Sequence, residues 1–332
     1  DPSLLLEAAS DFSRQPGVVS DASAQSFLTR FPLPLIIHSL QTKGEDYPGL
    51  EDVVVDCLGK IFRTRYGSSL IPQYMNFVLV GLGAVSQKVR CLACVAIQCL
   101  LENTNEVTAL QIVRQYDAYT LLLDCLIHGD ELVSAAATNA ITSLAGYPDG
   151  LGIIFPASTD EATRLENEYM KCSSMGRVRV LALIQRLFSL SSTVASEIAK
   201  SNLLNLFESE VKNTDDTLVT LSVLELLYEL VEVQHSAVFL SKTVLLDLLS
   251  SIISNQSAES ILRSRGMMII GRLLSNENAY AFINEPTVRS VVMAIDGRFD
   301  LLESREADEY ECALESLGQI GSSFRGATLL LS

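Results

Sequence analysis

The chain has 332 residues, of which 48% are hydrophobic and 19% charged, and 24 basic against 40 acidic residues give a net charge of −16. This composition suits a large buried core and excludes a disordered chain, and the negative charge disfavours nucleic acid and anionic lipid as partners. Apolar runs fall short of the roughly 18 residues that cross a bilayer, and the first residues do not show the basic segment followed by an apolar one that is typical of a signal peptide. We therefore expect a soluble protein that binds neither nucleic acid nor membranes.

Long amphipathic helices are expected throughout, because apolar residues recur every three or four positions rather than every two. They lie near residues 51–66, 88–103, 131–146, 176–190, 216–233, 259–275 and 305–322. Aligning each helix on one apolar position gives the anchors Ile61, Leu100, Leu144, Leu187, Leu227, Ile270 and Leu317, spaced by 39, 44, 43, 40, 43 and 47 residues. This period is typical of HEAT and armadillo arrays.

A position that was not used in the alignment supports it. Three residues before each anchor stand Leu58, Ile97, Ile141, Ile184, Leu224, Met267 and Leu314, all large and apolar. Such offsets share one buried helical face, and a shorter apolar segment with a turn precedes most of the long helices. We predict an all-α, right-handed α-solenoid of about seven HEAT/armadillo-like repeats that forms a single domain over residues 1–332.

Two segments interrupt the repeat. Between Ile154 and Gly176, Ser158 followed by Glu161 forms a capping box, which predicts a polar surface helix. The acidic segment from Asp296 to Glu311 predicts a long loop. Because solenoid ends need polar capping repeats, and this chain begins without methionine and ends on "ATLLLS", we also expect it to be a fragment of a longer protein.

Residues with catalytic or metal-binding chemistry do not form a recognisable site in the sequence. The three histidines have no metal-ligand spacing to any cysteine, and Cys91 and Cys94 occupy core-type helical positions. The glycines of "VGLGAVS" (residues 80–86) read as turn glycines without the lysine of a phosphate loop, and Asp215–Asp216 reads as a helix cap. We expect no enzyme, cofactor, metal or small-molecule substrate. Seven cysteines without framework spacing suit a reducing compartment, so we expect a cytoplasmic location, with the nucleus left open.

The remaining candidate site is the exposed flank of the long helices, which lines the binding groove in solenoids. Helical offsets place twelve residues there: Gln98, Glu102, Asn139, Thr142, Gln185, Ser222, Glu225, Glu229, Arg265, Arg272, Glu315 and Gln319. The stripe is polar and of mixed sign, with arginines toward the C-terminal repeats. We expect Arg265 and Arg272 to face acidic groups of a protein partner.

Four stretches of these repeats resemble a known family, the proteasome non-ATPase regulatory subunit 5 family, over roughly residues 84–331. They are "SQKVRCLACVAIQCLLENTNEVTALQIV", "LVSAAATNAITSLAGYPDGLGIIF", "GRVRVLALIQRLFSLSSTVASEIAKSNLLNLFESEV" and "ECALESLGQIGSSFRGATLLL". The resemblance implies a non-catalytic chaperone that binds the C-terminal helical domain of one proteasomal AAA ATPase subunit during assembly of the 26S regulatory-particle base. It also implies release before the holoenzyme matures. No family motif assigns contact residues, and the resemblance does not say which ATPase is bound.

Two other functions remain open at this stage. A generic armadillo scaffold or adaptor with another protein partner would show the same periodicity. A nuclear-import receptor is disfavoured, because such receptors carry tryptophan and asparagine ladders, whereas this chain has no tryptophan and only Asn139 at a comparable offset.

Overall fold

The computed structural model describes residues 1–43, 46–157, 164–301 and 307–332, and every regular element in these ranges is helical. The chain divides into two compact units, Asp1–Pro156 and Ala157–Ser332. In the described ranges, none of the helices has both the length and the apolar composition needed to cross a membrane. The all-α prediction is confirmed.

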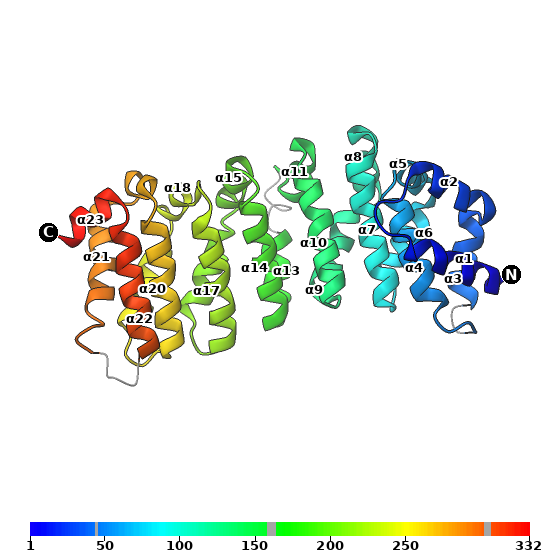
Figure 1. The fold of residues 1–332 in the computed structure, drawn as a ribbon. Coiled ribbons are helices and arrows are strands. Elements are labelled where there is room, and N and C mark those ends of the chain that lie inside the picture. The colour runs from blue at the N-terminus through cyan, green and yellow to red at the C-terminus, as the bar shows by residue number, and fades with distance from the viewer. Residues whose placement is uncertain (44–45, 158–163, 302–306) are drawn as a thin grey trace. The chain divides into compact units, whose positions relative to one another are not determined.

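The first unit is built from three stacked long helices, α4, α7 and α10, with shorter helices between them (Figure 1). Its elements are α1 (Pro2–Arg14), α2 (Asp21–Arg30), α3 (Leu33–Lys43), α4 (Leu50–Phe62), α5 (Arg65–Leu70), η1 (Ile71–Tyr74), α6 (Met75–Leu82), α7 (Gln87–Asn103), α8 (Glu106–Gln115), α9 (Ala118–His128), α10 (Glu131–Ala145) and α11 (Pro148–Ile154). Helix α7 packs against both α4 and α10, so the long helices form one continuous layer.

The second unit repeats the arrangement with α14, α17, α20 and α22 as its long helices (Figure 1). Its elements are α13 (Arg164–Lys171), α14 (Ser174–Phe188), α15 (Ser192–Lys200), α16 (Leu204–Lys212), α17 (Thr217–Glu232), α18 (Ser236–Leu240), α19 (Leu245–Ser254), α20 (Ser260–Leu274), η2 (Glu277–Ala281), α21 (Glu285–Asp296), α22 (Ala307–Gly321) and α23 (Phe324–Leu330). Helix α17 lies between α14 and α20, and α20 lies between α17 and α22.

Each long helix is followed by a short helix that the two-helix repeat predicted from the sequence did not include. Several of these short helices begin at side-chain caps: the oxygen of Thr64 accepts from the Gly67 amide, and Asn105 and Ser191 act likewise before α8 and α15. Helices α11 and α18 begin without such a cap. A capping oxygen satisfies amide groups that the first helical turn leaves unpaired. The repeat therefore contains three helices.

The predicted buried face is present in six repeats and wrong in the last. The anchors from Ile61 to Ile270 are at most 1% exposed, as expected. In α22, by contrast, Leu314 is 50% exposed, and the buried residues are Glu309, Ala313, Ser316 and Ile320. Helix α22 packs mainly on α20 and only lightly on α21, so its buried face is rotated relative to the other long helices.

The two predicted interruptions have different outcomes. Ser158 and Glu161 lie outside the described residues, although the polar helix α13 begins at Arg164. In the acidic segment, residues 307–311 belong to α22 rather than to a loop. Glu309 within it is fully buried, so the prediction of a long acidic loop is wrong for this part of the segment.

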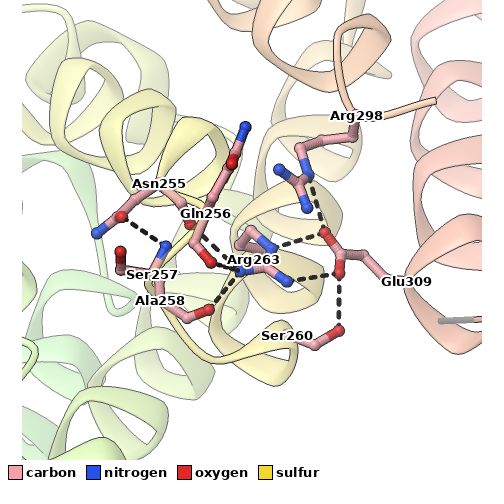
Figure 2. Close-up of polar contacts among 8 residues, drawn as sticks. All are labelled: Asn255, Gln256, Ser257, Ala258, Ser260, Arg263, Arg298 and Glu309. Atoms are coloured by element: carbon pink, nitrogen blue, oxygen red, sulfur yellow. Dashed lines mark hydrogen bonds and ion pairs between the residues drawn. The ribbon is translucent and has the colours of Figure 1, made fainter. Parts of the chain in front are cut away.

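Glu309 is buried because three groups from distant parts of the second unit bind its carboxylate (Figure 2). Arg263 donates two hydrogen bonds to it, of 2.7 and 2.9 Å, Arg298 donates one of 3.0 Å, and Ser260 donates one of 2.8 Å. Burial opposes ionisation, but these hydrogen bonds and the two positive charges hold the pKa of Glu309 below its usual value. A charge can be buried only when it is paired in this way.

Most of the small structural motifs follow the sequence prediction. Cys94 is fully buried, and Asp216 caps α17 by accepting from two backbone amides. Gly81 is an exception, because it lies inside α6 rather than in a turn. A Cβ atom at Gly81 would lie 3.0 Å from the Cβ of Ala93, so glycine allows α6 to approach α7 closely.

Candidate partner-binding surface

The twelve predicted surface residues lie on long helices of both units, and none of them is buried. Gln98 and Glu102 lie on α7 and Asn139 and Thr142 on α10, whereas the second unit carries Gln185 on α14, Ser222, Glu225 and Glu229 on α17, Arg265 and Arg272 on α20, and Glu315 and Gln319 on α22. Their assignment to partner binding remains a prediction.

In the first unit, Glu102 links two neighbouring long helices at this surface. Its Oε1 accepts a 3.0 Å hydrogen bond from Gln98 and a 2.8 Å hydrogen bond from Ser143 on α10. Thr142 donates to the carbonyl of Thr138 within its own helix. The polar groups of this patch therefore bond mainly to one another.

In the second unit, two ion pairs connect α17 and α20. Arg265 Nε lies 2.7 Å from Glu225 Oε1, and one helical heptad further on Arg272 Nη2 lies 2.5 Å from Glu232 Oε2. Arg272 also donates to the carbonyl of Tyr228, and its guanidinium lies 4.1 Å from the centre of the Tyr228 ring, a stacking arrangement that favours arginine over lysine. We name this pair of contacts the α17–α20 ladder.

The ladder changes what the arginines can offer to a partner. Both were expected to supply free positive charge, but each already pairs with a glutamate of the same chain. Glu229 lies between the two glutamates in sequence, is exposed, and has no hydrogen bond or ion pair to any described residue. The charge left available at this point is negative.

An open hollow of about 630 Å³ lies over this part of the surface. Four predicted residues line it: Gln185, Glu225, Glu229 and Arg272. Offsets alone did not select the other four, Ser189, Tyr228, Glu232 and Val233. Glu232 could have been predicted from the sequence, because it lies three residues after Glu229 and therefore on the same face of the helix as Glu225 and Glu229.

Gln319 lies differently from the other predicted residues. Its amide oxygen is buried and has no hydrogen-bond partner, and it lies 2.6 Å from the place that a Cβ on Gly271 would occupy. The side chain therefore packs onto α20, and it offers less to a partner than the offsets predict.

A further arginine of the second unit, Arg177 on α14, also pairs with a carboxylate of the same unit. Arg177 Nε lies 2.7 Å from Glu210 Oε1, and the hydroxyl of Tyr169 donates to the same oxygen. Burial and the neighbouring Glu210 carboxylate raise the pKa of Tyr169, so its hydroxyl remains a donor. These contacts fix α13 and α16 to α14.

The described residues contain no group of three or more His, Cys, Asp or Glu side chains that could hold a metal ion. Cys94 and Cys125 are neighbouring thiols, and both are fully buried. A hydrogen bond with Cys94, together with Arg90, lowers the pKa of Cys125 to about 7. Its Sγ donates to the Leu82 carbonyl, so this group joins α9 to the preceding repeat.

Comparison with known proteins supports the fold and shows the family. Among solved structures, the Kap95p structure with RanGDP matches at a TM-score of 0.57 and 13% identity, over 96% of this chain and 38% of that chain, and it shows the fold alone. An engineered protein matches with a TM-score of 0.47 and 13% identity, over 97% of this chain and 86% of that chain. A designed armadillo repeat protein in complex with the peptide (KR)4 matches with a TM-score of 0.43 and 14% identity, over 73% of this chain and 99% of that chain.

The Kap95p match establishes a HEAT/armadillo-type α-solenoid and spans under two fifths of that protein. No curated protein matches the chain. The model of the family described as "Proteasome non-ATPase 26S subunit" matches residues 50–331. Because this match covers most of the chain, including every long helix from α4 to α22, the chain belongs to the proteasome non-ATPase 26S subunit family.

Proposed function

We propose that the chain is a non-catalytic assembly chaperone of the regulatory-particle base of the 26S proteasome. It would bind the C-terminal helical domain of one proteasomal AAA ATPase subunit and accompany that subunit through base assembly intermediates. The family match over residues 50–331 is the observation that carries the proposal. Within that family, the four repeat stretches quoted above resemble regulatory subunit 5, and this narrower assignment is part of the proposal.

The surface of the second unit supports a folded protein as the ligand. Four consecutive long helices present polar side chains to solvent, and the hollow of about 630 Å³ is open and lined mainly by polar residues. Helical-repeat proteins use such flanks to bind extended surfaces of other proteins, whereas small-molecule sites are mostly enclosed and apolar. A small helical domain fits this kind of surface better than a metabolite does.

Compartment and excluded partners follow from the same proposal. An assembly chaperone of the proteasome would act in the cytoplasm, with the nucleus as a second site, and seven free cysteines suit either reducing compartment. The net charge of −16 makes nucleic acid and anionic membranes poor partners.

The proposal can be tested by binding. The chain would be immobilised, and the C-terminal domain of each proteasomal ATPase, expressed separately, would be passed over it, with the corresponding domains of unrelated AAA ATPases as controls. We expect saturable binding of one proteasomal domain and none of the controls. If no proteasomal domain binds, the chaperone proposal is wrong and a general armadillo scaffold with another partner takes its place.

A further inference from the structure

We propose that Glu229 and the hollow above it bind a lysine or arginine side chain on a helix of the partner. The inference rests on the proposed function, since it specifies how the ATPase domain is recognised. It reverses the charge relation expected from the sequence, in which arginines of this chain would face acidic partner groups.

The first argument is the geometry of the α17–α20 ladder. Glu225, Glu229 and Glu232 lie three or four residues apart, so they share one face of α17. Arg265 and Arg272 are separated by seven residues and neutralise the first and the last of these glutamates. Between the arginines, α20 presents no positively charged side chain, because residues 266–271 are uncharged. The middle glutamate is left without a cation.

The second argument concerns what surrounds Glu229 on its other side. Helix α14 contributes Gln185 and Ser189 to the hollow, and these two side chains hydrogen-bond to each other at 3.1 Å. Neither carries a positive charge. The lining holds three glutamates and one arginine, and Arg265 pairs with Glu225 beside it, so one negative charge, that of Glu229, remains uncompensated.

The third argument is that the carboxylate of Glu229 is accessible, because this residue is exposed. Glu232 keeps 65% of its side chain exposed and Glu225 keeps 44%, although both are paired. A helix lying along this flank could bring a cation to Glu229 while touching the Tyr228 ring edge, and aromatic side chains with charged neighbours are typical of interface centres. A second copy of this chain fits poorly, because its net charge of −16 would repel the first.

The experiment replaces Glu229 by lysine and by glutamine in the full chain. The control is Glu7→Lys, the same charge change at an exposed residue of α1 in the other unit that has no partner among the described residues. Association rates and Kd for the ATPase domain that binds wild type would be measured at low and high salt. We expect Glu229→Lys to weaken binding about tenfold at low salt, mostly through slower association, with a smaller loss for Glu229→Gln and none for Glu7→Lys.

A charge-swap cycle identifies the partner residue. Each exposed lysine or arginine of the bound domain would be replaced in turn by glutamate, and one such change should restore binding to Glu229→Lys. If Glu229→Lys binds as tightly as Glu7→Lys, the inference is wrong while the proposed function stands. If Glu229→Lys instead alters self-association in light scattering, the occupant is a second copy and the inference is wrong. If wild type binds no ATPase domain, both proposals fail together.

Discussion

Replacing Glu309 by glutamine tests the electrostatic centre of the second unit. Glutamine has nearly the same shape, so the change removes charge without creating a cavity. Arg263 would keep backbone acceptors, the carbonyls of Asn255, Gln256 and Ala258. Arg298 would lose the carboxylate of Glu309, with which it pairs. The expected result is a large loss of stability, because a buried guanidinium would be left with an uncompensated charge.

The magnitude follows from burial. The side chain of Glu309 is fully buried and those of Arg263 and Arg298 are each 4% exposed, so solvent screening gives no relief. Removing one partner from a buried ion pair typically costs about 3–5 kcal/mol. We therefore expect Glu309→Gln to lower the free energy of unfolding of the second unit by about 3 kcal/mol or more.

Arg298→Leu is the matched comparison. Among the residues that the structure describes, two positive charges and one negative charge meet in this cluster, and Arg298 Nη1 is buried without a hydrogen-bond partner. Removing Arg298 leaves a neutral Arg263–Glu309 pair with its two hydrogen bonds intact. Because no uncompensated buried charge is left among these residues, Arg298→Leu should cost much less than Glu309→Gln.

The assay is urea unfolding of the full chain followed by circular dichroism, with hydrogen exchange of α20 and α22 to assign the transition to the second unit. The folded pKa of Glu309 lies below the unfolded value, so the unfolded state binds more protons in acid and the stabilisation is lost as pH falls below about 4. The difference between wild type and Glu309→Gln should shrink there. A glutamine variant within about 1 kcal/mol of wild type at neutral pH would refute the reasoning.

Other expected outcomes concern packing and surface charge. Gly67→Ala should destabilise the first unit by about 1–3 kcal/mol, because the new Cβ would lie 1.9 Å from the backbone oxygen of Ile61. Gly318→Ala should instead stabilise the second unit in urea unfolding, because its new Cβ would meet no atom within 4 Å and alanine favours the helix. Ile320→Ala should cost about 2–5 kcal/mol and Leu314→Ala under about 1 kcal/mol. Glu229→Lys should slightly raise the thermal midpoint by relieving like-charge repulsion on α17.

Much of the fold could be predicted because it depends on local periodicity. Offsets along a single helix placed Ile61 and the next five anchors in the core, where they are at most 1% exposed. The prediction was wrong for the last repeat, because the buried face of α22 depends on which helices contact it, and this helix packs mainly on α20. The additional short helix was missed although its capping residues, such as Thr64, were visible in the sequence.

Pairing between repeats was harder to foresee, because it depends on residues about forty positions apart. Glu309 pairs with Arg263 and Arg298, 46 and 11 residues away, so the acidic segment read alone suggested a solvated loop. The ladder did leave a signal, since Arg265 and Arg272 each stand 40 residues after their glutamates. Residues at one repeat spacing lie on adjacent helices, and opposite charges there predict an ion pair.

Carboxylate footprinting of the complex tests the central claim most directly. The free chain, and the chain bound to the ATPase C-terminal domain, would be labelled with a carbodiimide and a small amine, and modification would be read residue by residue by mass spectrometry. Binding through the flank of α17 predicts strong protection of Glu229 and unchanged labelling of Glu7. Equal labelling of Glu229 in the free and bound chain, with protection elsewhere, would contradict the claim.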